Sequence, residues 1–188
     1  MMNDRIPDGD LLERARKGDH AAFRTLVDRY EHVVAATVMG MLGSGAEAED
    51  VGQETFIRFY AALNRFRGEA SLKTYLTRIA INQSLNALKR RKRFLSRHVE
   101  GELMDSIELD SGAGPADRAE SREVREVVRD AIERLSPKQR AVVTLRLIDG
   151  YSTRETAEIL GVPEGTVLSR LSRALKKLGP QLQPLVEA

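Results

Sequence analysis

Apolar residues recur at every third or fourth position along most of this chain, which is the pattern of helices that bury one face. The pattern covers residues 11–30, continues through the nearly apolar stretch 33–42, and returns as one stripe over residues 124–135. We find no run in which apolar and polar residues alternate as they do in a half-buried strand. The sequence therefore predicts an all-α protein.

Several residues of the capping and turn-forming types mark where these helices begin. Asp19 is placed to accept backbone hydrogen bonds at the start of a helix, and Ser71 is placed in the same way before residues 72–93. Ser136 followed by Pro137 is typical of a helix start, because proline fits the first helical turn. These positions predict separate helices rather than one long rod.

The stretch 100–115 interrupts the helical pattern. It is acidic, contains glycine and serine, and lacks a sustained apolar stripe, which is typical of a mobile linker. We therefore predict two small helical domains, residues 1–97 and 119–188, joined by an acidic flexible linker over residues 98–118.

Charge is segregated along the chain, although the formal net charge is only +2. Residues 58–98 hold eleven basic residues and one acidic residue, whereas residues 99–120 hold seven acidic residues and one basic residue. A basic block of this kind repels itself unless an anionic partner neutralises it. A polyanion partner is the favoured interpretation, and a solvated basic face is the alternative.

Composition narrows the functional classes. The chain has no cysteine, which excludes disulfides, thiolate metal sites and a cysteine nucleophile. Its apolar runs are far shorter than the roughly 20 residues that span a bilayer, and its charged N-terminus lacks the apolar core of a signal peptide. No nucleophile–base constellation or glycine-rich phosphate loop is present. We expect a cytoplasmic protein without membrane insertion, catalytic residues, metal or cofactor.

The basic block also carries aromatic residues. Five of the nine aromatics lie between Phe56 and Tyr75, among arginines and lysines, a mixture that suits single-stranded nucleic acid. The alternative for Phe56, Phe59 and Tyr60, which we favour, is a place in the core. Asn82 and Asn86 share one helix face. Their amides suit base recognition, and ordinary solvent exposure is the equally favoured alternative. The expected single-strand contacts are Arg67, Lys73, Arg78, Asn82, Asn86, Lys89 and Arg90.

Residues 153–178 have the spacing of a helix-turn-helix. A short helix over 153–160 precedes Gly161, which can adopt the left-handed turn, and a second helix follows from Glu164. One face of the second helix is apolar (Val167, Leu171, Ala174, Leu175 and Leu178), whereas the other carries hydroxyls and cations that suit a major groove (Ser169, Arg173 and Lys176, flanked by Thr166, Ser172 and Lys177). A helical hairpin with no DNA role is the alternative.

Acidic residues gather at positions 47–54. Asp50 and Glu54 are four apart, as two metal ligands on one helix face are, yet no nearby histidine or further carboxylate completes a shell. We therefore interpret this cluster as a docking surface for a basic protein partner.

Three stretches together carry a family resemblance: residues 48–63 (AEDVGQETFIRFYAAL), residues 66–93 (FRGEASLKTYLTRIAINQSLNALKRRKR) and residues 135–178 (LSPKQRAVVTLRLIDGYSTRETAEILGVPEGTVLSRLSRALKKL). They resemble, in this order, bacterial RNA polymerase sigma factors of the extracytoplasmic-function (ECF) branch. The likeness covers about residues 10–95 and 120–180.

The resemblance implies specific roles. The helix with Asp50, Gln53, Glu54 and Phe56 would dock on the clamp helices of the polymerase β′ subunit. The loop 68–73 would capture a flipped base of the minus-ten promoter element, which Asn82 and Asn86 would also contact. The helix from Glu164 would read the minus-thirty-five element through Thr166, Leu168, Ser169, Arg170, Ser172, Arg173 and Lys176. The acidic linker is similar to sigma linkers that run through the RNA channel.

The implied partners are core RNA polymerase (its β′ and β subunits), promoter DNA and an anti-sigma factor, with the free protein a monomer. Three residues depart from the family pattern: Gly52 replaces an aliphatic residue, Tyr75 a tryptophan and Leu168 a basic residue.

Two rival functions can be distinguished from this one by experiment. A helix-turn-helix repressor or activator would bind duplex DNA alone as a dimer, and a carboxylate-dependent nuclease would need magnesium.

Overall fold

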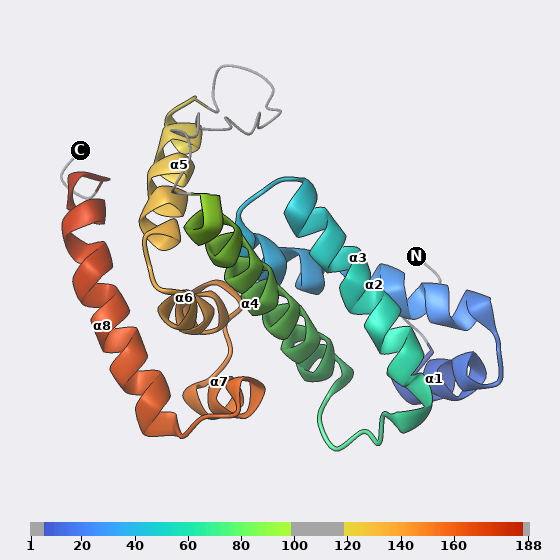
Figure 1. The fold of residues 1–188 in the computed structure, drawn as a ribbon. Coiled ribbons are helices and arrows are strands. Elements are labelled where there is room, and N and C mark those ends of the chain that lie inside the picture. Colours follow the sequence, from blue (N-terminus) through green and yellow to red (C-terminus); the bar gives the residue numbers. More distant parts are fainter. Residues whose placement is uncertain (1–5, 99–118, 186–188) are drawn as a thin grey trace.

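The computed structural model describes residues 6–98 and 119–185, and the described residues form helices and turns without a strand (Figure 1). The first part, here the N-terminal module, contains α1 (Asp8–Arg16), α2 (His20–Leu42), α3 (Ala46–Ala62), the 3-10 turn η2 (Leu63–Arg65) and α4 (Leu72–His98). The second part, the C-terminal module, contains α5 (Ala119–Glu133), α6 (Pro137–Val143), the π-helical turn η4 (Thr144–Ile148), α7 (Thr153–Leu160), α8 (Glu164–Leu182) and the 3-10 turn η5 (Gln183–Leu185). The all-α prediction is confirmed, and the predicted linker lies outside the described residues except for residue 98.

The helices begin and end at the capping and turn residues that the sequence indicates. The Asp19 carboxylate accepts hydrogen bonds from the backbone N–H groups of Ala21 and Ala22, both at 3.0 Å, at the start of α2. The Ser71 hydroxyl accepts one from the Thr74 N–H at 3.1 Å at the start of α4. Gly161 ends α7 in the left-handed conformation, with φ of 62°.

The core of the N-terminal module lies between α1, α2, α3 and α4. Phe59 of α3 is completely buried there, and it contacts the rings of Phe23, Phe66 and Tyr75. The core interpretation of Phe59 is therefore confirmed, whereas Tyr60 is 44% exposed and does not belong to it. The cluster fixes α3 against α4 and so positions the surface between them.

The C-terminal module has a core of its own. Val167, Ala174 and Leu178 of α8 are buried against the other helices of this module. Leu175, which we expected on the same apolar face, is instead 47% exposed, because it follows Ala174 by one residue and so points about 100° away. Residues at α8 positions 167, 171, 174 and 178 complete the buried stripe without it.

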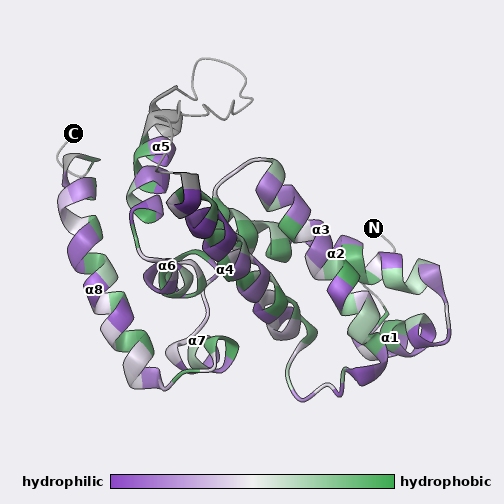
Figure 2. Cartoon of the chain, viewed as in Figure 1, coloured by the Kyte–Doolittle hydropathy of each residue, from purple (hydrophilic) through white to green (hydrophobic). Residues whose placement is uncertain are grey.

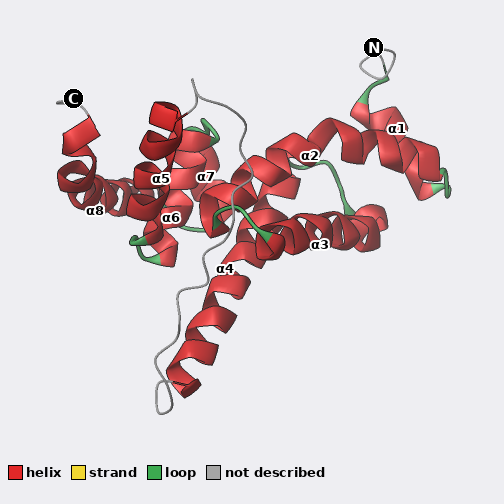
Figure 3. Ribbon diagram, turned by 90° about the horizontal axis from the view of Figure 1, so that it is seen from above, coloured by secondary structure: helices red, strands yellow, loops and turns green. Residues whose placement is uncertain are grey.

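The two modules lie side by side and share a third apolar cluster (Figure 1). Met41 and Ile81 from the N-terminal module pack there with Leu145, Tyr151 and Ile159 from the C-terminal module. The second half of α4 projects beyond the bundle, and it is strongly hydrophilic at its end (Figures 2 and 3). Among the described helices, none combines the length and apolarity that a membrane crossing requires.

Candidate nucleic-acid interface

An open cleft of about 380 Å³ lies between α3 and α4. Its polar lining comes from Arg58 and Arg65 on one side and from Tyr75, Asn82 and Gln83 of α4 on the other. Guanidinium groups attract phosphates, amides both donate and accept hydrogen bonds, and an aromatic ring offers a flat face. The cleft thus combines the groups that bind an unstacked base and its backbone.

Tyr75, which lines this cleft, also belongs to the aromatic cluster of the N-terminal module. Its ring lies 4.8 Å from the Phe66 ring and 6.1 Å from the Phe59 ring, centroid to centroid. Such ring pairs favour edge-to-face and offset-stacked arrangements, which limit how Tyr75 can be oriented. A base entering the cleft would therefore meet a surface whose shape is already set.

The predicted single-strand contacts divide into two groups. Asn82 lines the cleft and is exposed. Asn86 is exposed one turn further along α4 but does not line the cleft, and the same holds for Lys89 and Arg90 beyond it. Arg67 is exposed in the loop before α4. These residues form a continuation of the cleft rather than a single pocket.

Lys73 and Arg78, in contrast, face the C-terminal module. The Lys73 ammonium lies 5.0 Å from the centroid of the Tyr151 ring, within the range of a cation–π contact. The Arg78 guanidinium donates a hydrogen bond to the backbone carbonyl of Glu158 at 3.0 Å. The structure therefore does not bring these two predicted contacts together with Asn82 in the cleft.

Asn82 is the one polar residue of the cleft that belongs to the predicted strand contacts, whereas Arg58, Arg65, Tyr75 and Gln83 do not. Arg58 and Arg65 lie seven positions apart across α3 and η2, so both point to the same side, toward α4. The sequence offered a signal for both arginines. They lie among the aromatic residues, and residues seven positions apart on a helix share one face. Gln83 gives no comparable signal, since its neighbour Asn82 carries the same amide.

The helix-turn-helix prediction is confirmed in its geometry, with α7 and α8 meeting at Gly161. Leu168, Ser172, Arg173 and Lys176 are exposed on α8. Thr166, Ser169 and Arg170 are half-buried, and the Ser169 hydroxyl donates to the backbone carbonyl of Thr166 at 3.1 Å. No acidic residue occurs from position 165 to 178, so this outer surface is uniformly neutral or cationic. It can enter a groove without repelling phosphates.

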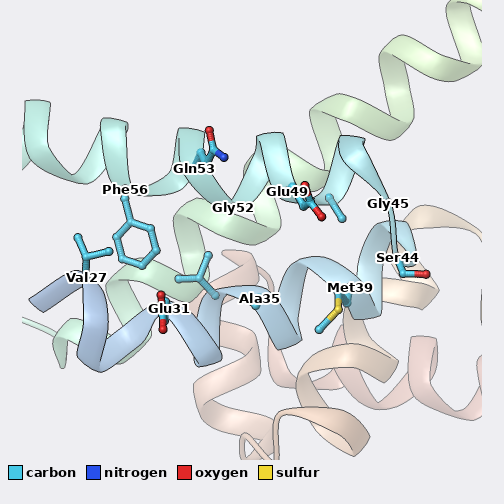
Figure 4. A pocket seen from close by; sticks show the side chains of 12 residues that line it. Val27, Glu31, Ala35, Met39, Ser44, Gly45, Glu49, Gly52, Gln53 and Phe56 are labelled. Carbon is cyan, nitrogen blue, oxygen red and sulfur yellow. The ribbon is translucent and has the colours of Figure 1, made fainter. Parts of the chain in front are cut away.

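A second pocket, with a volume of about 460 Å³, lies between α2 and α3 (Figure 4), and we call it the α2/α3 groove. Its apolar walls come from Val27, Val34, Ala35, Met39, Ala48 and Phe56, and the Phe56 ring points toward α2. Glu31 and Glu49 supply acidic groups at its lining. An apolar groove with carboxylates fits an amphipathic helix that carries basic residues.

The predicted docking residues occupy this groove only in part. Gln53 and Phe56 line it, whereas Asp50 is exposed outside it and Glu54 pairs with Arg58 at 2.7 Å. Gly52 also lines the groove, and a Cβ added to it would meet no atom within 4 Å. Among the described residues, no group of three or more metal-ligating side chains is gathered, at Asp50 and Glu54 or elsewhere.

Three groups whose pKa is shifted by burial, Asp149, Tyr151 and Arg140, lie where the two modules meet. Burial raises the pKa of Asp149, which the hydrogen bond from Thr37 and the charge of Lys73 partly offset. Burial also raises the pKa of Tyr151 and lowers the pKa of Arg140. Arg140 is only 7% exposed, and its guanidinium donates to the backbone carbonyls of Met41, at 2.7 Å, and Glu133. Burial therefore disfavours charge on these three groups.

Two family models match the chain. Sigma-70 region 2 matches residues 26–94, which contain the cleft and the groove, and Sigma-70 region 4 matches residues 125–178, which contain the helix-turn-helix. Together they cover most of the described residues, and they follow one another in the order that the resemblance implies.

Individual proteins agree with these matches. The ECF RNA polymerase sigma-E factor of Escherichia coli (strain K12) is 39% identical to this chain over an alignment of 194 residues, which covers 98% of this chain and 99% of that protein. The solved structure of CnrH in complex with the cytosolic domain of CnrY has a TM-score of 0.66 and 26% identity, covering 94% of this chain and 97% of that chain. The sigma factor RpoE of Bartonella quintana, solved with the anti-sigma factor NepR, has a TM-score of 0.66 at 24% identity, covers 86% of this chain and 96% of that chain, and shares the fold. This chain belongs to the ECF sigma factors of bacterial RNA polymerase, which recognise promoters in transcription initiation.

Proposed function

We propose that this chain is a dissociable sigma subunit that binds core RNA polymerase, directs it to promoter DNA and helps to open the promoter. The observation that carries the proposal is the division of two binding surfaces between two modules. The cleft of the N-terminal module presents amides and arginines around Tyr75, whereas α8 of the C-terminal module presents an exposed cationic face. One surface suits an opened strand and the other a duplex.

In this proposal the cleft holds an unstacked base of the minus-ten element. Asn82 and Gln83 read its edge, Arg58 and Arg65 hold the phosphates, and Tyr75 forms the wall. Arg67, Asn86, Lys89 and Arg90 extend the contact along the strand. Because the opened strand gains contacts that the duplex cannot make, binding shifts the equilibrium toward the open promoter.

The C-terminal module reads the minus-thirty-five element with α8. Arg173 and Lys176 would contact phosphates or base edges, together with Thr166, Ser169, Arg170 and Ser172. Leu168 is 55% exposed at the same surface and would offer an apolar contact such as a thymine methyl group. A leucine there predicts a different preferred base from that of a basic residue.

The α2/α3 groove docks on the polymerase through Phe56 and Gln53, with Asp50 and Glu54 beside it. The match between an acidic, apolar groove and a basic amphipathic helix supports this assignment. Residues 1–97 and 119–188 act as two bodies in the assembled enzyme. The chain works in the cytoplasm as a monomer without a reaction of its own, and it serves a regulon related to stress or the cell envelope. An anti-sigma factor restrains it.

The test compares the chain alone, core polymerase alone and their mixture on labelled genomic fragments, with sedimentation to report the oligomeric state. We expect a monomeric chain that binds duplex DNA weakly and a mixture that retains specific fragments. A dimer that selects palindromic duplexes without polymerase would contradict the proposal and support a helix-turn-helix repressor. Magnesium-dependent cleavage that Asp50→Ala abolishes would support a nuclease instead.

A further inference from the structure

The first helix of the chain is tied to the turn that precedes the cleft. The Arg16 guanidinium, in the last turn of α1, donates a hydrogen bond from Nε to the backbone carbonyl of Leu63 at 3.1 Å. It donates a second one from Nη2 to the backbone carbonyl of Phe66. These acceptors lie 47 and 50 positions further along the chain. One side chain therefore joins α1 to η2 and to the first residue of the segment 66–71, here the η2–α4 loop.

The two carbonyls lie where helical hydrogen bonding stops. The last carbonyls of a helix have no intrahelical donor, so another group has to satisfy them. Helix α3 and the turn η2 end at Ala62 and Arg65, and α4 begins only at Leu72. An arginine presents its N–H groups as a rigid fork, so it can hold two acceptors in one geometry. Arg16 thus fixes the place where the chain leaves η2.

Helix α1 is itself held in place at both ends, beside the end of α3 (Figure 1). Leu11 in its middle is buried in the same core cluster as Leu63 of η2. At its N-terminal end, the Asp8 carboxylate pairs with Arg29 and accepts a hydrogen bond from the Tyr30 hydroxyl, both on α2. The helix therefore connects α2 to the η2–α4 loop as a strut.

The η2–α4 loop is fixed at its far end as well. The Ser71 hydroxyl accepts a hydrogen bond from the Thr74 N–H at 3.1 Å, in the first turn of α4. Between the two fixed ends, residues 67–69 are exposed, and Gly68 has a positive φ of 73°. The exposed part of the loop is therefore short, and its course depends on where its two ends are held.

The carbonyls that Arg16 holds flank two cations of the proposed strand contact. Arg65, which lines the cleft, lies between Leu63 and Phe66 in the sequence, and Arg67 follows Phe66 directly. Because the backbone on either side of an arginine sets the direction of its side chain, a shift of these carbonyls would redirect both cations. The two hydrogen bonds of Arg16 therefore bear on the site without touching the strand.

We propose that Arg16 is a positioning residue for promoter opening, which holds the end of η2 and the start of the η2–α4 loop so that Arg65 and Arg67 meet the opened strand. The inference rests on the proposed function. It extends the strand-binding site to α1, which precedes residues 26–94, the part that the Sigma-70 region 2 model matches. A loop that is held before DNA arrives binds a strand without the entropy cost of ordering it.

The test compares Arg16→Ala with Arg14→Ala. Both arginines lie in the last turn of α1, and both donate two hydrogen bonds. Those of Arg14 go to the Asp19 carboxylate, at 3.0 and 2.8 Å, rather than to the loop. The two variants thus lose the same charge and the same interaction with the helix dipole. Only Arg16→Ala releases the η2–α4 loop.

A dye on Glu69→Cys reports the loop directly, without DNA or polymerase, because the chain has no cysteine of its own. We expect the fluorescence anisotropy of the dye to decrease when Arg16→Ala is added, since the loop then moves more freely. Adding Arg14→Ala instead should leave the anisotropy unchanged. Circular dichroism confirms that each variant is folded.

Promoter opening is then measured with the unlabelled variants, core polymerase and a promoter that the wild type opens. Permanganate reactivity, divided by the amount of bound promoter, gives the open fraction. Charge-assisted hydrogen bonds hold the loop, so Arg16→Ala should lower this fraction by at least about threefold, and Arg14→Ala should match the wild type. A loss of folded protein or of polymerase affinity does not change a fraction of bound promoters, so a merely structural defect would leave it unmoved.

Arg16→Lys separates the paired hydrogen bonds from the charge. A lysine keeps the positive charge but replaces the rigid fork by one ammonium group. We expect an open fraction between those of the wild type and Arg16→Ala. Full recovery in Arg16→Lys would show that charge alone is sufficient and would overturn the inference.

Other outcomes would overturn it as well. An unchanged open fraction in Arg16→Ala, or an equal loss in Arg14→Ala, would remove the positioning role. A lower open fraction with unchanged anisotropy would mean that Arg16 contacts DNA itself. If the wild type opens no promoter with core polymerase, the proposed function is wrong, and titration of the chain alone with a labelled single-stranded oligonucleotide of mixed sequence decides the inference. Weaker binding by Arg16→Ala than by Arg14→Ala is then expected, and equal binding would contradict it.

Discussion

Thr37 of α2 and Asp149, the residue after η4, lie 2.8 Å apart between hydroxyl and carboxylate oxygens, although 112 positions separate them in the sequence. The same hydroxyl lies 3.0 Å from the backbone carbonyl of Val33. A hydroxyl carries one proton and cannot donate fully to two acceptors. A proton on Asp149 would satisfy both, because the carboxyl would donate to Thr37 while Thr37 donates to Val33.

We therefore expect the packing of the two modules against each other to depend on pH. Burial raises the pKa of Asp149 above its ordinary value of 3.8. The stabilisation that its protonated form gives to the contact between the modules is therefore fully present below pH 3.8 and is lost as the pH rises through the raised pKa. Lys73, whose charge opposes the shift, the Tyr151 hydroxyl, Glu155 and Arg146 are other titratable groups near it. Energy transfer between one dye on each module should therefore decrease with rising pH over this range.

Asp149→Asn is the matched control for the pH dependence, because an amide keeps an acceptor for Thr37 and carries no charge. We expect the modules of this variant to stay packed as the pH rises, with a flatter energy-transfer curve than that of the wild type. A variant curve that follows the wild type at every pH would show that another group governs the packing.

Gly52→Ala should separate stability from partner binding. A Cβ at position 52 meets no atom of the chain, so the variant should gain about 1 kcal/mol of helix propensity, or about 2–4 °C in Tm. The same methyl group fills part of the α2/α3 groove, so affinity for core polymerase should decrease. Gly9 is exposed, and a Cβ added there would also meet no atom within 4 Å, so Gly9→Ala is the control that should leave affinity unchanged. A more stable Gly52→Ala with full affinity would remove the groove from the docking surface.

Asn82→Ala should impair promoter opening with little change in stability, because the side chain is exposed in the cleft and makes no core contact. Asn86→Ala should have a smaller effect, since Asn86 does not line the cleft. Permanganate reactivity of unpaired thymines measures opening. Equal loss in both variants, or a larger loss in Asn86→Ala, would contradict the assignment of the cleft to the flipped base.

Arg173→Ala should instead weaken binding to the upstream element of the promoter before it opens, while leaving the opening of bound promoters intact. A bidentate base contact is worth about 1–3 kcal/mol, and a phosphate contact would lower the salt slope of binding by about 1. Footprinting of the upstream element over a series of salt concentrations distinguishes a base contact from a phosphate contact. If the variant opens promoters poorly but binds the upstream duplex normally, the roles of the two modules are reversed.

Local structure was largely predictable because caps and periodicity act over a few residues. Asp19, Ser71 and Gly161 mark helix ends by their own chemistry, and the apolar stripe of α8 follows from its spacing apart from Leu175. The helix-turn-helix could be recognised for the same reason. The position of Asn82 on an accessible face of α4 likewise followed from helical spacing.

The packing of the modules was not predictable from spacing. Helix α4 buries two faces, one with Leu76 and Ala80 in its own module and one with Ile81 against the C-terminal module, and periodicity cannot say which partner covers a second face. The consequence for the site is that Lys73 and Arg78, typical strand-binding residues by sequence, face a protein surface.

In the proposed function, this chain chooses where core polymerase starts transcription. Core polymerase is incubated with genomic DNA of the source organism, with and without the chain, and the 5′ ends of the transcripts are sequenced. We expect the chain to add start sites that share two upstream elements at a fixed spacing. Identical start sites in both reactions, with no co-elution of the chain and the polymerase, would contradict it.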